Sequence, residues 1–327
     1  MAPCRVVLEV ISCTILIVIS KGQVWSLSNS DITHTMLRKC NTTISSQFEK
    51  EGEITSLGYP NYYEEGITCA YTLLGKPLER VQLLFTHFNL PEPAKDIPEH
   101  QRCLHTDFVA IYNMNNNTIR REIDHYCGSS VPLPVMSSKS GMQVVFKSGA
   151  NPLTRLPHPF VYGFSVRFKF VKDFGITSGQ QTKPGTCKFI YNSTLVRNGT
   201  LNSPNPGGFY PQDTTCHYIF RARNGEIVRL IFKYFDVEGI LPCDRTSDSD
   251  SLEFSNFPSA DRKIPPYCGA NGPKIMQSDA SYFRVTFKSN DKFDGTGFTA
   301  DFQFLDISKQ PHVIRRIIAP IVTGTKG

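Results

Sequence analysis

The stretch CKFIYNSTLVRNGTLNSPNPGGFYPQDTTC, residues 187–216, begins the part of the chain that decides the fold. The landmarks that follow it, in chain order, are IVRLIF at 227–232, Cys243, DSLEF at 250–254, YCG at 267–269 and FKSNDKFDGTGF at 287–298. Four cysteines with distinct short motifs between them form a specific pattern, whereas a lone Cys-Gly or Gly-Phe pair would carry no information. The pattern marks one folded unit that runs from Cys187 to Phe304.

The same pattern occurs once earlier in the chain. The first two cysteines of each copy are 29 residues apart, and the last two are 24 apart in the first copy and 25 in the second. The shared motifs are Tyr126-Cys127-Gly128 with Tyr267-Cys268-Gly269, Phe146-Lys147-Ser148 with Phe287-Lys288-Ser289, Gly163-Phe164 with Gly297-Phe298, and Tyr63 with Tyr210, each six residues before the second cysteine. Self-similarity at this level predicts two copies of one domain.

Both copies consist of short strand-like runs separated by Gly, Pro and Asn. Apolar residues at 164, 166, 168 and 170 alternate with polar ones, and the run 298–304 shows the same alternation. A period of two residues is typical of a half-buried strand. No stretch of a dozen residues has an apolar stripe with helical spacing. Many short strands of this kind favour an all-β fold in which two antiparallel sheets pack as a sandwich.

Composition places the chain among ordinary globular proteins. It has 327 residues, a net charge of +6, 20% charged residues and 40% hydrophobic residues, and this length suggests about two domains. The small positive excess is not gathered in a basic helix or a Lys/Arg cluster, so the sequence predicts no nucleic-acid partner.

The N-terminus has the features of a secretory signal peptide. Arg5 is followed by the apolar run 6–19 and by the small residues around Ser20-Lys21-Gly22, and the apolar run is too short for a confident membrane span. Cleavage would remove Cys4 and Cys13. The remaining eight cysteines fall into two sets of four in a compartment where disulfides persist, and each set permits three pairings.

The C-terminal end predicts no membrane anchor. The apolar run 317–322 is short, and the chain ends on polar residues, so neither a transmembrane helix nor a lipid-anchor signal is encoded. We therefore expect a secreted, soluble product.

These motifs and spacings resemble the CUB domain, an extracellular, jelly-roll-like β-sandwich module. The resemblance implies that the first cysteine of each copy pairs with the second and the third with the fourth. The implied disulfides are Cys40–Cys69, Cys103–Cys127, Cys187–Cys216 and Cys243–Cys268. Each would stabilise its domain by about 3–4 kcal/mol through loop closure. CUB domains usually have Trp two residues after the second cysteine, where this chain has Tyr71 and Tyr218; a tyrosine can fill that core site if its hydroxyl finds a partner.

The resemblance and the repeat together predict the domain boundaries. The expected segments are a signal peptide at 1–22, a leader at 23–39, a first CUB domain at 40–171, a linker at 172–186, a second CUB domain at 187–305 and a tail at 306–327. The linker lacks cysteines and apolar periodicity, so we expect residues 173–185 to be accessible to proteases.

The sequence holds none of the common catalytic motifs. It has no His-Glu-x-x-His, no Cys-x-x-Cys, no Gly-x-Ser-x-Gly and no glycine-rich phosphate loop, and its eight histidines are scattered. The expected protein is therefore not an enzyme.

A calcium site in the second copy is implied by the resemblance. Many CUB domains bind calcium through a Glu before the third cysteine, an Asp after it, and an Asp in the motif Phe-x-Ser-Asp. The corresponding residues here are Glu238, Asp250 and Asn290, with Asp291 next in the chain as a substitute for the missing carboxylate. Carboxylate and amide oxygens are suitable calcium ligands. The alternative is an acidic loop at 244–250 that is only solvated.

The first copy is predicted to be calcium-free. Pro91 stands where the family has Glu, with Glu92 one residue late, and Gly149 replaces the third ligand, although Asp107 matches the second. A proline-containing insert follows at 149–162.

Four Asn-x-Ser/Thr acceptors fit an extracellular protein. They are Asn41, Asn116, Asn192 and Asn198.

Within the family, two stretches are similar to insect suppressor-of-lurcher-like proteins, which resemble the paired-CUB auxiliary proteins of ionotropic glutamate receptors. The stretches are CHYIFRAR at 216–223 and SNDKFDGTGF at 289–298. This implies a secreted or cell-surface adaptor that binds a receptor ectodomain presenting an exposed Lys or Arg. The alternatives are the recognition arm of a CUB-containing extracellular protease and a secreted CUB protein that binds carbohydrate or matrix.

Overall fold

The computed structural model describes most of both repeats. The described residues are 16–20, 23–27, 40–93, 96–115, 119–149, 163–243, 246–261 and 263–309. Most of the predicted signal peptide and tail, the acceptor Asn116 and nearly all of the insert 149–162 lie outside them. Strands β1 (Leu16–Ser20) and β2 (Gln23–Leu27) pair antiparallel.

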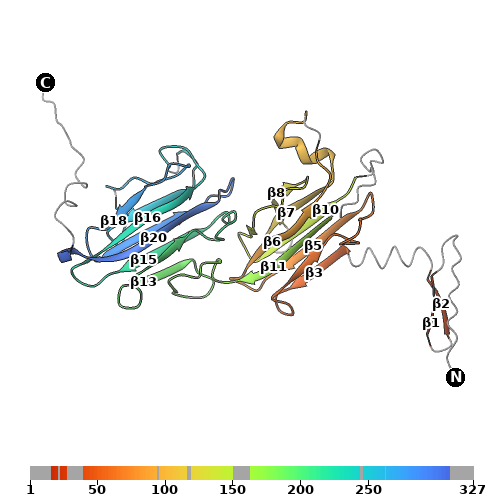
Figure 1. The fold of residues 1–327 in the computed structure, drawn as a ribbon, viewed down its shortest axis with the longest axis horizontal. Coiled ribbons are helices and arrows are strands. Elements are labelled where there is room, and N and C mark those ends of the chain that lie inside the picture. The colour runs from red at the N-terminus through yellow and green to blue at the C-terminus, as the bar shows by residue number, and fades with distance from the viewer. Residues whose placement is uncertain are drawn as a thin grey trace.

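The first domain is a sandwich of two sheets, seen on the right in Figure 1. The five-stranded sheet has the order β3 (Asn41–Ser45), β5 (Thr68–Leu74), β10 (Gly141–Lys147), β7 (Phe108–Asn115), β8 (Ile119–Tyr126). The four-stranded sheet has the order β4 (Glu51–Thr55), β11 (Gly163–Val171), β6 (Arg80–Asn89), β9 (Val135–Met136). One short 3-10 helix, η1 (Glu99–His105), precedes β7.

The second domain repeats this arrangement. Its five-stranded sheet has the order β12 (Gln180–Gln181), β13 (Lys188–Asn192), β15 (Thr215–Arg221), β19 (Tyr282–Lys288), β17 (Ser251–Ser255). Its four-stranded sheet has the order β14 (Asn198–Asn202), β20 (Gly297–Asp306), β16 (Glu226–Asp236), β18 (Ile275–Gln277), and η3 (Ile307–Lys309) follows. The all-β prediction is confirmed, with one difference: β3 pairs with β5, and β13 with β15, in parallel.

The alternation read in the sequence places aromatic side chains between the sheets. In β11, Phe164, Val166, Phe168 and Phe170 are buried, and β20 buries its corresponding residues. Burying one such side chain stabilises the fold by about 1.5–3 kcal/mol. The apolar residues that alternate along these strands therefore contribute to the core of each domain.

The eight described cysteines form four disulfides with the expected pairing. They are Cys40–Cys69, Cys103–Cys127, Cys187–Cys216 and Cys243–Cys268. Both tyrosines at the usual Trp position are buried. The Tyr71 hydroxyl donates a hydrogen bond to the Thr55 carbonyl at 2.8 Å, whereas the Tyr218 hydroxyl has no hydrogen-bond partner within the described ranges.

The segment expected to be an open linker is packed. Phe174 and Ile176 are 2% and 3% exposed and belong to the core cluster of the second domain. Further along, β12 adds to the edge of β13. Two apolar residues among polar ones show no periodicity in sequence, yet here they anchor the start of the segment. Residues 182–184 are exposed, and accessibility to proteases is left to experiment.

The two domains exchange contacts across their junction. Met136 of the first domain joins the core cluster of the second, and Phe209 of the second packs against the core of the first. Gln82 donates a hydrogen bond to Asn205 at 2.6 Å, and the Phe209 N–H donates to the Pro134 carbonyl at 2.9 Å. The junction is therefore held by apolar packing and by hydrogen bonds.

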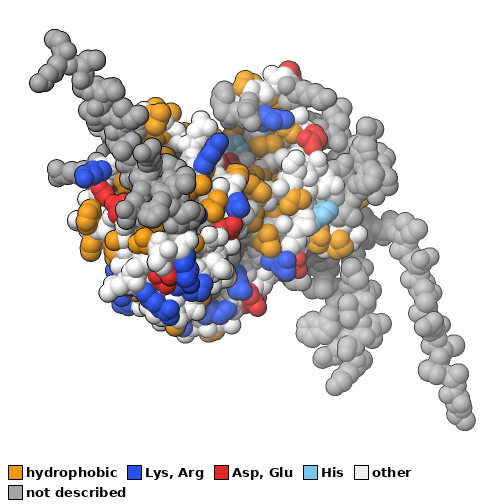
Figure 2. Space-filling model, turned by 60° about the vertical axis from the view of Figure 1, so that its left-hand side comes forward, with side chains coloured by type: hydrophobic (Ala, Val, Ile, Leu, Met, Phe, Trp, Pro, Cys, Tyr) orange, Lys and Arg blue, Asp and Glu red, His pale blue; other side chains and the backbone are white. Residues whose placement is uncertain are grey.

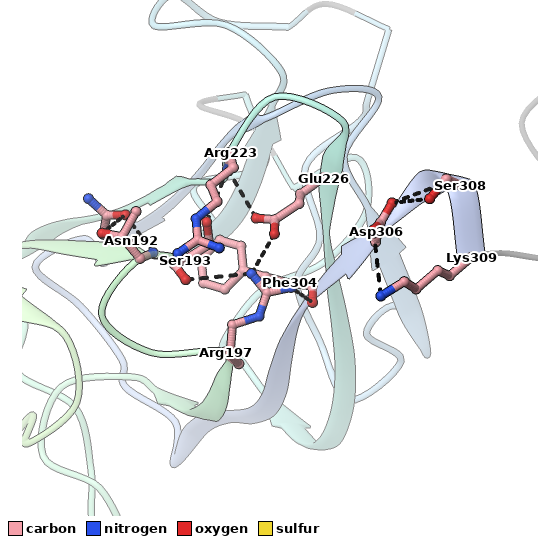
Figure 3. Close-up of polar contacts among 10 residues, drawn as sticks. Asn192, Ser193, Arg197, Arg223, Glu226, Phe304, Asp306, Ser308 and Lys309 are labelled. Atoms are coloured by element: carbon pink, nitrogen blue, oxygen red, sulfur yellow. Dashed lines mark hydrogen bonds and ion pairs between the residues drawn. The ribbon is translucent and has the colours of Figure 1, made fainter.

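A buried glutamate, Glu226, lies at the start of β16 in the second domain (Figure 3). Glu226 accepts from Arg197 at 2.5 Å and from the Arg223 N–H at 3.1 Å, and Arg197 also donates to the Phe304 carbonyl at 3.0 Å. Burial alone would raise the pKa of Glu226, but hydrogen bonds from Ser193, Arg197 and the Arg223 N–H lower it to about 2. The network favours the ionised carboxylate.

The first domain repeats this network at equivalent positions. Glu79 forms an ion pair with Lys50 and accepts from the Lys76 N–H at 2.8 Å. Burial alone would raise the pKa of Glu79, but hydrogen bonds from Lys50, Ser46 and the Lys76 N–H lower it. A buried, ionised glutamate therefore occurs at equivalent positions in both sandwiches.

Candidate functional site

Four loop residues meet at one end of the second sandwich. Asp250 directly precedes β17, and Asn290 follows β19, whose Lys288 lies opposite both Thr215 of β15 and Ser251 of β17. Glu238 follows β16. Because neighbouring antiparallel strands run in opposite directions, residues before one strand and after its neighbour come together at the same edge.

Tyr210 connects these loops through hydrogen bonds. Its hydroxyl donates to Asp250 Oδ2 at 2.5 Å and accepts from the Glu238 N–H at 2.9 Å. The Asn290 N–H donates to Asp250 Oδ1 at 2.6 Å. Both oxygens of Asp250 are thereby fixed in position, and each retains a lone pair.

The site carries negative charge in a buried place. Asp250 is 1% exposed. Burial, together with the negative charge of Glu238, raises the pKa of Asp250 to about 6, although hydrogen bonds from the Tyr210 hydroxyl and the Asn290 N–H oppose the shift. Glu238 Oε2 is buried and has no hydrogen-bond partner within the described residues. A buried carboxylate oxygen without a donor is costly, and a bound cation would remove that cost. The donor set therefore fits a hard cation such as calcium.

The remaining predicted ligands lie differently. The Asn290 side chain donates to the Asp248 carbonyl and accepts from the Lys292 N–H, both at 2.7 Å, and Lys292 forms an ion pair with Asp248. Asp291 instead pairs at 2.8 Å with Arg121 on β8 of the first domain. In the part of the chain that the structure describes, no three His, Cys, Asp or Glu side chains are grouped to hold a metal. The site thus offers the carboxylates of Glu238 and Asp250, whereas the Asn290 amide oxygen already accepts from the Lys292 N–H.

The first domain has half of this arrangement. Tyr63 donates to Asp107 Oδ2, and the Gly149 N–H donates to Asp107 Oδ1, both at 2.7 Å. Glu92, however, is satisfied by the N–H and hydroxyl of Ser129, at 2.9 and 2.5 Å. Glu92 thus uses its Oε1 oxygen on Ser129, whereas Glu238 has a buried oxygen without a donor within the described residues. A calcium-free first copy stays a prediction.

The sequence reasoning missed Tyr210 as a site residue. It used Tyr63 and Tyr210 only as landmarks of the repeat, six residues before the second cysteine. The signal was present in the sequence: both copies have a tyrosine six residues before the second cysteine and an Asp after the third, so the two residues could share a contact in each domain. In the structure each of these tyrosines donates to its Asp.

Three of the four predicted glycosylation acceptors are described. Asn41 and Asn198 are exposed on β3 and β14, and Asn192 is half-buried at the end of β13. The Asn192 side chain accepts from the N–H and hydroxyl of Thr194 at 2.9 and 2.8 Å. Glycosylation at these positions stays a prediction.

Two tandem sandwiches, each closed by two disulfides, are the architecture of an extracellular binding module. The model of the CUB domain matches residues 40–155 and 188–302, so the chain belongs to the CUB domain family. CUB domains occur in extracellular proteins and are non-catalytic binding modules. Among the described residues there is no helix with the length and hydropathy needed to cross a membrane.

Curated relatives are identical to this chain at about a quarter of the aligned positions. Human cubilin is 26% identical over 255 residues, which is 77% of this chain and 6% of cubilin. Mouse neuropilin-1 is 27% identical over 275 residues, 83% of this chain and 26% of that protein. The zinc metalloproteinase nas-39 of Caenorhabditis elegans is 24% identical over 255 residues, 77% of this chain and 24% of that protein. The chain thus spans about a quarter or less of each relative.

Proposed function

We propose that the chain is a non-catalytic extracellular adaptor that binds a partner protein through the acidic end of its second CUB domain, with calcium bound there. The observation that carries this proposal is Glu238 Oε2, a buried oxygen without a hydrogen-bond partner in the described residues, next to the buried carboxylate of Asp250. The adaptor is secreted or stays at the cell surface, in keeping with the predicted signal peptide.

Glu238, Asp250 and Asn290 would hold the cation. A bound calcium supplies positive charge that offsets the two carboxylates and ties their loops together. Extracellular modules bind calcium at roughly 0.1–1 mM, and free calcium about tenfold above the dissociation constant stabilises a domain by about 1.4 kcal/mol.

The partner presents an exposed Lys or Arg to this end of the domain. Fixed carboxylates accept charge-assisted hydrogen bonds from such a side chain, and salt weakens contacts between exposed charges. On the face shown in Figure 2, Lys and Arg lie beside Asp and Glu, so no large field of one sign covers that face. Partner binding should therefore weaken with chelator and with salt.

An ionotropic receptor ectodomain is the partner class that we favour. The motif SNDKFDGTGF at 289–298, one of the two that resemble suppressor-of-lurcher-like proteins, is also the loop that contributes Asn290 to the site and Asp291 to the contact with Arg121. The family resemblance and the candidate site therefore rest on the same loop.

Calcium titration of the whole chain tests the site. Calorimetry and thermal melting would compare the wild type with Glu238→Ala and Asp250→Ala, and with Glu253→Ala as a matched control, because Glu253 lies on β17 in a surface ion pair with Lys288. We expect calcium to raise the melting temperature of the wild type and of the control only. If all four proteins melt alike in calcium and in chelator, the acidic loops are merely solvated and the proposal fails.

Capture from cell-surface extracts tests the partner. The chain would be immobilised in calcium or in chelator, and the retained proteins identified by mass spectrometry. Calcium-dependent retention of receptor subunits is the expected result. Retention of proenzymes would instead favour the recognition arm of a protease, the reading that the similarity to nas-39 supports, and retention through glycans alone would favour a carbohydrate-binding module.

A further inference from the structure

The outer face of the five-stranded sheet in the second domain gathers basic side chains from three strands. Alternate residues of these strands form the core, so the residues between them point outward. The basic residues at outward positions are Lys188 on β13, His217 and Arg221 on β15, and Arg284 and Lys288 on β19. They come from separate parts of the chain, so the sequence alone shows no Lys/Arg cluster.

The strand register places these side chains around His217. Lys188 lies directly opposite His217 on the neighbouring strand. On its other side His217 faces β19 at the position between Arg284 and Lys288. Burial lowers the pKa of His217; the positive charges of Arg284, Lys188 and Lys288 lower it further, and the charge of Glu253 opposes them. Three cations are therefore close enough to act on one imidazole ring.

Little negative charge offsets these cations. Glu253 on β17 is the one acidic residue at the outward positions of β13, β15, β19 and β17, all of which the structure describes, and it pairs with Lys288 at 2.5 Å. Arg284 donates to the Pro258 carbonyl, but its Nε has no acceptor within the described residues. The face therefore keeps a net positive charge and an unused N–H donor.

The first domain lacks this cluster on the same sheet. Positions in the two domains correspond through a constant offset of 147 residues up to the second cysteine and its strand. An offset of 141 relates β10 to β19, because Phe146 and Phe287 each lie opposite the second cysteine of their domain. The residues equivalent to the five basic ones are Asn41, Ala70, Leu74, Gln143 and Lys147. The basic face therefore belongs to the second domain and is not a requirement of the fold.

The layout of the face favours a linear polyanion. Spacings of about 4.8 Å between strands and about 3.4 Å per residue along a strand place the Cα atoms of Lys188, Arg284 and Lys288 roughly 12–14 Å apart. A small anion reaches one of these side chains, whereas a polymer with a charge on each repeat reaches several. No large apolar side chain is exposed at the outward positions of these described strands. The centre of a protein interface and an insertion into a membrane would both require one.

We propose that this face of the second domain binds a sulfated glycosaminoglycan. Lys and Arg donate charge-assisted hydrogen bonds to such oxyanions, and clusters of them form heparin-binding patches. CUB domains occur in extracellular proteins, where these polymers are found. The surface is additional to the protein-binding site proposed above, and it uses none of the three residues that would hold calcium.

Fluorescence anisotropy of a labelled heparin oligosaccharide tests the proposal on the full chain. Lys188→Ala and Lys288→Ala change exposed side chains, and each should weaken binding by about two- to fivefold, the double variant by about tenfold. Lys147→Ala, at the equivalent position of the first domain, is the matched control and should bind like the wild type. Glu253→Gln should bind about twofold more tightly, because it removes the acidic residue of the face.

Two further measurements locate the ligand and keep the calcium site separate. Heparin should raise the pKa of His217 in an NMR titration, because bound anions offset the neighbouring cations. Affinity should fall with salt but not with chelator. Asn192→Gln is measured in parallel, since Asn192 lies opposite Arg221 and a glycan at that predicted acceptor would cover one end of the face.

The competing ligands are chemically desulfated heparin, poly-glutamate and phosphatidylserine vesicles, and we expect each to bind at least tenfold more weakly than heparin. Equal or tighter binding of any of them would overturn the proposal and assign the face to another class of anion. Two other results would also overturn it. One is no binding of heparin at low salt by either the wild type or Asn192→Gln, and the other is unchanged affinity in the double lysine variant.

Discussion

Replacing Glu226 by Gln removes the charge of one buried glutamate while keeping its size. The pKa of Glu226 falls from the ordinary 4.5 to about 2 in the folded protein. At about 1.4 kcal/mol per pH unit, this difference corresponds to about 3 kcal/mol of stability at neutral pH. The Glu226 side chain is 11% exposed but that of Arg197 is 46% exposed, so solvent weakens the pair and we expect a loss of about 2 kcal/mol.

The pH dependence identifies the cause of that loss. Since the folded pKa is lowered, the stabilisation is complete above about pH 5 and disappears as the pH falls from 4.5 toward 2. Urea denaturation from pH 7 to pH 2.5 should therefore show a gap between the wild type and Glu226→Gln that closes in acid. Glu253→Gln, which alters a more exposed pair with Lys288, should cost less than about 1 kcal/mol.

Coupling to Arg197 completes the test. Arg197→Met in the wild type should be destabilising. In the Glu226→Gln background it should cost less, because the ion pair is already absent there and the hydrogen bond to the Phe304 carbonyl is what remains to be lost. A gap that stays constant with pH, or a Glu226→Gln effect no larger than that of the control, would refute the reasoning.

Three further predictions follow from the disulfides and the packed segment. Intact mass after alkylation should show no labelled cysteine among the eight from Cys40 to Cys268 until a reductant is added; labelling before reduction contradicts this. Limited proteolysis between 173 and 185 should be slow in the wild type and faster in Ile176→Ala, which removes a buried side chain at a cost of about 2–5 kcal/mol; rapid cleavage of the wild type contradicts it. Gly179→Ala should lower the melting temperature, because Gly179 has φ +76° and faces the Tyr191 ring; an unchanged temperature counts against that contact.

The sequence predicted most of the fold because the repeated motifs coincide with the structural elements. The alternation at 164–170 became β11, and the resemblance supplied the disulfide pairing that spacing alone left open. The family resemblance also pointed to Asp250, which the structure places, buried, directly before β17; its role as a calcium ligand stays a prediction. Local sequence patterns therefore predicted the strands, and the family resemblance predicted the disulfide pairing and the choice of Asp250.

Contacts between distant segments were harder to predict. The Glu226 network was missed, although Ser193, Arg197, Arg223 and Glu226 recur in the first copy at the constant offset of 147 as Ser46, Lys50, Lys76 and Glu79. Alignment of the copies residue by residue would have found it. The pairing of Asp291 with Arg121 has no such signal, because it depends on how two domains meet, which no periodicity within either domain encodes.

The exchange of Met136 and Phe209 across the junction has a mechanical consequence. If a flexible linker joined the two domains, each domain could rotate independently of the other. Here each domain completes part of the other's core, so rotation about the junction would expose apolar surface and is resisted. Under the proposed function, a partner bound at the acidic loops of the second domain would therefore keep a fixed distance and direction relative to the first domain.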